Sequence, residues 1–331
     1  MQLTAAVRDL HRAHPRQFLT DVRTPFDGLW LHNPWITPVR DDEGEVVECD
    51  FTLIEESNRT PHHAIHGLIE GLNRRLDLRI RPTEFRGDIH LHPLERAWTP
   101  QVVEHLGRDV PYWIIAAGGK TDCTIKWWSP DRWQAVVDRF RGRLLFVQVG
   151  AKADRHPPLR GVLDLRGKTD VRQLVRLVHH SVGVVCPITS LMHLAAAVPP
   201  RTGRPQNRAC VVVAGGREPV NWFAYPHHQI LHTLGALRCC DNGGCWQART
   251  VPLGDGDTAR DARLCVDPVP QNRARNAPLL PRCMAMITPD DAIRAIERYH
   301  LADACSYLNS RVWNRIEPSL SPPQKDKSPL L

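Results

Sequence analysis

The strongest constraint on the fold is a regular alternation of short apolar runs and amphipathic segments between residues 112 and 215. Tyr112–Ala116 is continuously apolar, as expected for a strand that is buried on both faces of a parallel sheet. Strands that alternate with helices predict a doubly wound α/β sheet, whose ligands bind at the carboxyl ends of the strands. Further strands are predicted at Leu144–Val149, Val162–Leu165, Val182–Cys186 and Cys210–Ala214.

Helix signals fall between and around these strands. Ser129, followed by Pro130, can cap one helix, and Asp170 and Thr288 open two others. Nearer the N-terminus the apolar spacing predicts helices over Gln2–His14 and His62–Asn73 and a strand over Phe18–Val22, although no strand precedes the first helix. Three histidines of the second helix are expected on a solvated face: His62, His63 and His66.

Length and charge narrow the function classes. The chain of 331 residues can form two domains with a core in each. Its net charge of +7 favours an anionic ligand such as a nucleotide, or a place near acidic lipid, over a nucleic-acid track. No apolar run is long enough to span a membrane, and the N-terminus has no signal-peptide layout, so we expect a cytoplasmic protein with reduced cysteines.

Three turns at predicted strand ends carry groups that suit an anion. The first has small residues and two lysines but lacks Walker-loop spacing, and it could be only a glycine turn with solvated lysines. The second opens a helix at Thr189, although its histidine could equally be an interior one. The third, Gly215–Glu218, lines the same crevice or is simply a turn. The candidate anion-binding residues are Gly119, Lys120, Thr121, Lys126, Thr189, Ser190, Met192 and His193.

Five cysteines fall within residues 239–283, a Gly-, Asp- and Pro-rich stretch that interrupts the alternation. Cys240, Cys245, Cys265 and Cys283 could form a closed tetrahedral site for one structural zinc or iron, and Cys239 could replace Cys240. Unlinked buried thiols and disulfides are the alternatives. The polar composition of residues 241–282 leads us to expect that they order only around an ion.

Four segments together resemble the C-terminal half of the family 9 glycosyltransferases, the ADP-heptose heptosyltransferases of lipopolysaccharide assembly. Lys126–Ser129 is similar to the family's Lys-x-Trp-Pro segment, and Leu165–Asp170 to its Leu-x-Gly-Lys-Thr-Ser segment. Val184–Ala197 resembles the Asp-Ser/Thr-Gly-x-x-His-Leu-Ala-Ala-Ala motif, and Cys283–Tyr299 the closing Cys-Met-x-x-Ile-x-Pro helix. The cysteine stretch resembles the finger of the branch that heptosylates autotransporter proteins.

The resemblance implies a GT-B architecture of two Rossmann-like domains. Residues 1–107 would form the acceptor-side domain without its first strand, and residues 108–304 the nucleotide-sugar domain with the cysteine-rich insertion 239–283. Residues 305–331 would be a tail that is largely disordered. The eight candidate residues, which belong to the first two turns, then become donor-binding residues.

The implied reaction transfers a heptose-like sugar, with inversion, from a nucleotide-diphosphate sugar such as ADP-heptose to a glycan or protein hydroxyl. No catalytic metal and no nucleic-acid partner are implied, whereas peripheral inner-membrane contact and a homo-oligomer are compatible with the resemblance. Ile188 and Ser190 depart from the family's acidic and glycine positions. The family's catalytic aspartate lies ahead of the first helix, inside which this chain begins, so we assign no catalytic residue and expect weak transfer. The alternative is a non-catalytic nucleotide-sugar-binding or scaffold protein that retains the GT-B fold.

Overall fold

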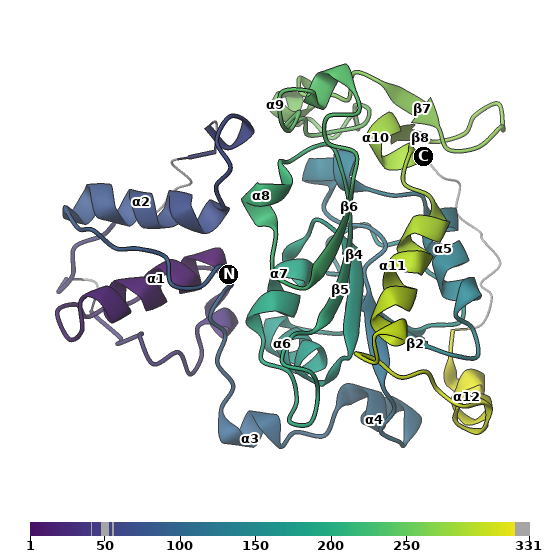
Figure 1. The fold of residues 1–331 in the computed structure, drawn as a ribbon, viewed down its shortest axis with the longest axis horizontal. Coiled ribbons are helices and arrows are strands. Elements are labelled where there is room, and N and C mark those ends of the chain that lie inside the picture. The colour runs from purple at the N-terminus through teal and green to yellow at the C-terminus, as the bar shows by residue number, and fades with distance from the viewer. Residues whose placement is uncertain (41, 48–52, 55, 322–331) are drawn as a thin grey trace.

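The computed structural model describes residues 1–40, 42–47, 53–54 and 56–321 (Figure 1). The α-helices are α1 (Gln2–Ala13), α2 (Ala64–Leu76), α3 (Pro93–Arg96), α4 (Gln101–Leu106), α5 (Pro130–Arg139), α6 (Val171–His180), α7 (Ser190–Ala197), α8 (Val220–Phe223), α9 (Thr258–Asp261), α10 (Arg282–Ala285), α11 (Pro289–Leu301) and α12 (Ser310–Ile316). The strands are β1 (Tyr112–Ile115), β2 (Leu145–Gln148), β3 (Leu163–Asp164), β4 (Gly183–Pro187), β5 (Ala209–Gly215), β6 (His228–His232), β7 (Pro268–Pro270) and β8 (Leu279–Pro281). The 3-10 helices are η1 (Asp27–Leu29), η2 (Glu56–Asn58), η3 (Thr121–Lys126), η4 (Arg238–Cys240) and η5 (Glu317–Ser319).

Six parallel strands form the central sheet in the order β3-β2-β1-β4-β5-β6. This is the strand order of a doubly wound Rossmann-like sheet, in which the direction of winding reverses between β1 and β4. The predicted α/β class with a parallel sheet is therefore confirmed. All five strands predicted between residues 112 and 215 form, each within two residues of the predicted bounds.

Both faces of the sheet are buried beneath helices, which explains the continuous apolar run of β1. Tyr112 and Ile114 face one core layer, which includes side chains of α6 and α7. Trp113 and Ile115 face the other layer, which includes side chains of α5 and α11. Figure 1 shows these helix pairs on opposite sides of the sheet. The alternation follows from strand geometry, because successive side chains of a strand point to opposite faces.

Two of the three predicted helix caps form as expected, and the third does not. Asp170 and Gln173 form a reciprocal capping box at α6, with N–O distances of 2.7 and 2.9 Å between each side chain and the other residue's backbone. Thr288 forms the same box with Asp291 at α11. Ser129 occupies the N-cap position of α5, but its side chain makes no capping hydrogen bond there.

The N-terminal part forms its predicted first helix but not the predicted strand that follows it. α1 matches the predicted helix and packs against α2 around a small apolar cluster that includes Leu10 and Ile69. The predicted strand Phe18–Val22 is wrong, and the described residues of 1–107 contain no strand. A single backbone bond, from Thr37 N to Thr20 O at 2.8 Å, pairs this extended segment, which is too little for a ladder.

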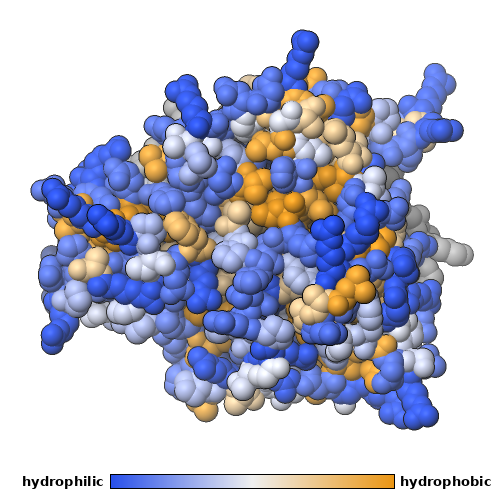
Figure 2. Space-filling model, viewed as in Figure 1, coloured by the Kyte–Doolittle hydropathy of each residue, from blue (hydrophilic) through white to orange (hydrophobic). Residues whose placement is uncertain are grey.

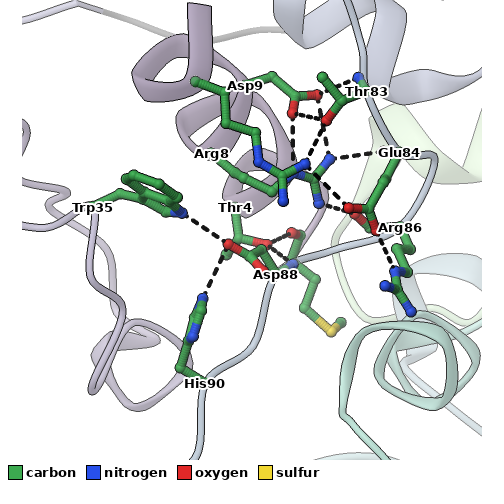
Figure 3. A network of polar contacts seen from close by, with 11 residues as sticks. Thr4, Arg8, Asp9, Trp35, Thr83, Glu84, Arg86, Asp88 and His90 are labelled. Carbon is green, nitrogen blue, oxygen red and sulfur yellow. Dashed lines mark hydrogen bonds and ion pairs between the residues drawn. The ribbon is translucent and has the colours of Figure 1, made fainter. Parts of the chain in front are cut away.

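A buried arginine joins α1 to the extended segment 83–90 (Figure 3). Arg8 donates to the carbonyl oxygens of Arg86 at 3.0 Å and of Glu84 at 2.8 Å, and it pairs with the adjacent carboxylate of Asp9. Asp9 in turn accepts hydrogen bonds from the backbone and hydroxyl of Thr83. These polar contacts hold the segment against α1.

Residues 305–321 do not form the predicted tail. They contain α12, whose Trp313 and Ile316 are buried in the same core layer as α6 and α7. These two apolar side chains bury enough surface for the segment to pack against the core. The helix was not expected from the sequence because the neighbouring residues are polar and rich in proline. Residues 322–331 lie outside the described residues.

The outer surface is mostly hydrophilic in the view of Figure 2, with apolar side chains gathered over the edge strand β6. Residues 228–231 of this strand are only half-buried. No helix in the described part of the chain is long and apolar enough to cross a membrane.

Buried neutral histidines predict acid sensitivity. Burial lowers the pKa of His63, His180 and His300 to about 4 each, which shows that the solvated face expected for His63 is wrong. The unfolded chain binds protons below its histidine pKa of about 6.5 and the folded chain does not, so stability should fall as pH drops from about 6.5 toward 4. Each histidine contributes at most about 1.4 kcal/mol per pH unit.

Urea unfolding between pH 7.5 and 5 measures this slope. His180→Phe should flatten the slope, because it removes a histidine whose pKa is lowered in the folded chain. The substitution breaks no hydrogen bond of the ring, since neither ring nitrogen of His180 has a partner among the described residues. The exposed His105 supplies the control variant His105→Phe, which should leave the slope unchanged. An equal slope in the wild type and in His180→Phe would contradict the prediction.

Candidate functional site

The loops after β1 and β4 meet at the reversal point of the sheet. In the first loop, Gly119 exchanges two backbone hydrogen bonds with Arg155, of 3.0 and 3.1 Å. A Cβ atom on Gly118 would lie 2.0 Å from the carbonyl oxygen of Arg155. This close approach explains Gly118 by packing, whereas a Cβ atom on Gly119 would meet no atom closer than 3.5 Å. Lys120 and Thr121, which follow, are exposed at the start of η3.

Lys126, the last residue of η3, reaches the loop that follows β5. Its Nζ atom lies 2.5 Å from Oε1 of Glu218, and the two side chains are 20% and 6% exposed. Arg217 contacts the same carboxylate oxygen. One largely buried carboxylate therefore holds two cations and ties the loop after β1 to the loop after β5.

The second predicted turn forms the start of α7. Thr189 is its N-cap residue, and its hydroxyl oxygen accepts a hydrogen bond from Leu191 N at 3.3 Å. Ser190 is exposed, so the first turn of the helix opens to solvent. Met192 is fully buried in the core and presents no surface to a ligand.

His193, one turn further along α7, is held by a tyrosine. Its Nδ1 lies 2.6 Å from the hydroxyl of Tyr225, and the two rings meet edge to face with centroids 5.5 Å apart. Burial lowers the pKa of His193 to about 3, and positive charge from the amino group of Met1 and from Lys126 contributes to the shift. The ring is therefore neutral near pH 7 and can exchange a hydrogen bond but supplies no positive charge.

Lys126 follows β1 and His193 follows β4, the two strands on either side of the reversal point of the sheet. The structure leaves Lys120 and Thr121 on the surface of the loop that contains Lys126. Sequence reasoning singled out the turn containing Glu218 but not the carboxylate itself. Little in the sequence indicates that Glu218 is buried, because an acidic residue next to an arginine in a turn usually faces solvent.

The five clustered cysteines converge on one small cavity of about 10 Å³. Its lining thiols belong to Cys239, Cys240, Cys245, Cys265 and Cys283. The nine cysteines in the described part of the chain are all free, so the disulfide alternative is not observed among them. Within that same part, no three His, Cys, Asp or Glu side chains stand close enough as placed to hold a metal ion. The convergence was predicted, whereas the metal centre itself is not confirmed.

The thiols of this cavity disfavour ionisation in the absence of a cation. Burial raises the pKa of Cys239 to about 11 and that of Cys283 to about 12, and neighbouring thiols add to both shifts. Burial likewise raises the pKa of Cys245 and of Cys265. Thiolates could form here only beside a positive charge, such as a bound cation.

A buried arginine organises the polar stretch between these cysteines. Arg249 is 1% exposed and pairs with Asp255 at 2.7 Å and with Asp261 at 2.5 Å. This ion-pair knot holds residues 249–261 together without an apolar core. It provides an ordering force besides the ion that the composition led us to expect.

Comparison with known proteins supports one family. Residues 87–202 match the family described as glycosyltransferase family 9 (heptosyltransferase). The matched segment contains β1 to β4 and the candidate residues Lys126, Thr189 and His193. No curated protein matches the sequence.

Several solved structures are similar to this chain. The iron-containing dodecameric glycosyltransferase TibC of enterotoxigenic E. coli H10407 is 18% identical, with a TM-score of 0.49, over 83% of this chain and 65% of TibC. ADP-heptose lps heptosyltransferase II of E. coli is 12% identical, with a TM-score of 0.46, over 74% of this chain and 63% of that one. A family 9 glycosyltransferase of Veillonella parvula DSM 2008 is 16% identical, with a TM-score of 0.44, over 74% and 61%. The chain thus spans slightly less than two thirds of their length.

The shared carboxylate at the crevice predicts a stability cost. Glu218→Gln would leave Lys126 and Arg217 without their counter-charge and should destabilise the protein by about 3 kcal/mol, the lower end for breaking a buried ion pair. Urea unfolding measures the difference. The control is Glu297→Gln, which removes the carboxylate that pairs with Arg139. Glu297 is more exposed than Glu218, so this change should cost less than about 1 kcal/mol. Equal costs for the two variants would show that Glu218 is not needed to hold the cations.

Proposed function

We propose that this chain binds a nucleotide-diphosphate sugar at the crevice beyond β1 and β4 and transfers the sugar to a hydroxyl group. The proposal rests on the placement of Lys126, Thr189 and His193 after the two strands that flank the reversal point of a doubly wound sheet, within the segment that matches the family. Ligands of such sheets bind at this point. The heptosyltransferase description of the family favours a heptose-like sugar, with ADP-heptose as the donor.

The candidate residues would have different roles in donor binding, which depend on their charge. Lys126 would neutralise the diphosphate, in competition with Glu218, which holds the ammonium group in place before the donor arrives. The first turn of α7, with Thr189 and Ser190, would offer backbone amides to the same phosphates. His193, being neutral, would orient a hydroxyl or phosphate oxygen through its ring nitrogen. Lys120 and Thr121 would close the loop over the nucleotide.

In the transfer, an acceptor oxygen attacks the anomeric carbon while the bond to the diphosphate breaks, and the configuration inverts. The acceptor proton passes to a base that we do not assign. Stabilising the departing diphosphate is electrostatic work, which Lys126 and the amides of α7 can do. Residues 1–107 would supply the acceptor side, which takes a glycan or a protein hydroxyl, and residues 108–304 the donor side.

One observation favours a second candidate, a binding protein without catalysis. Ile188, at the position where the family's motif carries an acid, is buried in the core and offers no carboxylate to the crevice. A protein of this kind would bind the donor and leave it intact. Sugar transfer measured beside donor binding separates the two candidates.

We also propose a structural zinc or iron at the cysteine cavity. Four of its five thiols would hold the ion: Cys245, Cys265, Cys283 and either Cys240 or Cys239. A cavity of about 10 Å³ has room for a single ion, and a cation would supply the charge that these thiols need in order to ionise. The ion would cross-link residues 239–283 and take no part in the transfer. TibC, a similar structure, is iron-containing.

A reducing compartment suits such a thiol cluster, so we place the protein in the cytoplasm, with peripheral contact to the inner membrane where the acceptor requires it. TibC is also dodecameric, and a homo-oligomer is part of the proposal. Light scattering of the purified chain would test it.

Donor binding should depend on Lys126. Lys126→Ala should weaken ADP-sugar binding by about 1.5–3 kcal/mol, the range for a hydrogen bond to a charged group. Calorimetry measures the affinity. The control Lys168→Ala removes an exposed lysine that donates to the backbone of Asp164 and should leave affinity unchanged. Equal affinities for the wild type and Lys126→Ala would remove Lys126 from the site, and the absence of any nucleotide binding by folded protein would reject both candidate functions.

Metal content tests the cysteine site. Elemental analysis of anaerobically purified protein should find about one zinc or iron per chain, because four thiolates complete a tetrahedral shell. Cys265→Ser should lower that content sharply. Cys305→Ser is the matched control, since Cys305 is buried elsewhere, near Val182. A metal-free wild-type chain, or equal contents in the two variants, would contradict the proposal.

A further inference from the structure

Trp246 holds a backbone conformation that large side chains rarely adopt. Its φ angle is +53°, in the left-handed region. Such a conformation persists only where surrounding contacts impose it, and it marks places where geometry serves a function. Here the backbone N–H of Trp246 donates to the carbonyl oxygen of Arg217 at 3.0 Å, and Arg263 donates to its carbonyl oxygen.

The indole of Trp246 reaches across to the N-terminal half of the chain. Its Nε1 donates to Oδ1 of Asn58 at 2.7 Å. The same Asn58 oxygen accepts from Gly244 N at 3.1 Å, and Asn58 Nδ2 donates to the Gly244 carbonyl oxygen at 2.9 Å. One side chain from η2 therefore makes three hydrogen bonds, all to two residues of the cysteine-rich insertion.

Two glycines make this approach possible. A Cβ atom on Gly243, whose φ is +106°, would lie 2.6 Å from the side-chain carbon of Asn58. One on Gly244 would lie 2.3 Å from the carbonyl oxygen of Arg217. The turn is thus shaped so that its backbone touches Asn58 on one side and the Arg217 loop on the other.

Cys245 stands between the two residues that bind Asn58, and its thiol lines the cysteine cavity. Three consecutive residues therefore join the cavity to Asn58, with no flexible linker between the two. A cation that pulls on the Cys245 sulfur therefore acts on the turn directly through the Cα atom of Cys245, which Gly244 and Trp246 flank. The backbone N–H of Cys245 also donates to Gly216 at 3.3 Å, which fixes the turn against the loop after β5.

We propose that Asn58, Gly244 and Trp246 form a latch that couples the cysteine cavity to the N-terminal half of the molecule. A soft cation bound by the thiols fixes the turn, and the turn then orders η2 and the residues that follow it up to α2. By linkage, an intact latch must also favour binding of the cation. Asn58 and Trp246 are positioning residues, and the inference rests on the proposed cysteine site and not on sugar transfer.

The first experiment uses zinc as the probe on the full-length chain. Hydrogen exchange of residues 56–69 should slow about fivefold between chelator-treated and zinc-loaded wild type, the lower end for coupling between two sites. In Asn58→Ala the zinc effect on these residues should disappear while zinc still binds. The matched control is Asn221→Ala, which removes the bond from Asn221 Nδ2 to the His62 carbonyl oxygen without touching the cysteine turn. This variant should keep the zinc effect.

The second experiment needs no metal. Alkylation of Cys245 by iodoacetamide, resolved by peptide mass spectrometry, should be several-fold faster in Asn58→Ala than in the wild type, because the turn loses its anchor. Asn221→Ala should react at the wild-type rate. Asn58→Asp, which keeps the oxygen that accepts from Gly244 and Trp246, should give an intermediate rate.

Equal Cys245 alkylation rates in the wild type and Asn58→Ala would overturn the latch, as would a zinc effect that survives in Asn58→Ala. Zinc that binds the wild type without slowing exchange at residues 56–69 would overturn it as well. Neither readout involves a nucleotide, so failure of donor binding and failure of the latch give different results.

Discussion

The sheet depends on the placement of one indole over one glycine. Trp113 of β1 pairs in register with Gly183 of β4, and a Cβ atom on Gly183 would lie 2.4 Å from the Trp113 ring. The indole fills the space that the glycine leaves, and it is fully buried. This contact packs β1 closely against β4, the neighbour with which the sheet reverses its winding. The crevice, and every loop that opens into it, follows from that pairing.

Ion pairs rather than apolar contacts join the loop after β1 to the loop after β5. Glu218 accepts both Lys126 and Arg217 in a largely buried position, where an unpaired charge would be expensive. The carboxylate therefore offsets both positive charges and fixes the loop after β1 against the loop after β5.

The cysteine-rich insertion is held in two independent ways. The Arg249 ion pairs order its polar middle, and the glycine turn around Cys245 fastens it to Asn58 and to the Arg217 loop. The insertion is thus attached to both halves of the molecule at the edge of the crevice. Burial raises the pKa values of its thiols Cys265 and Cys283.

The sequence by itself determined the parallel sheet and the capped starts of α6 and α11, because apolar periodicity and capping residues act over a few neighbouring positions. It also determined that Lys126 follows β1 and that Thr189 and His193 follow β4, the two strands where the winding of the sheet reverses. Only the tertiary structure decided that Glu218 holds Lys126, that His193 is neutral, and that Met192 is buried. It also replaced the strand expected at Phe18–Val22 with an extended segment, and the tail expected from residue 305 with α12. These outcomes depend on contacts between residues far apart in the chain, and no local pattern records which partner a charge or an apolar side chain will meet.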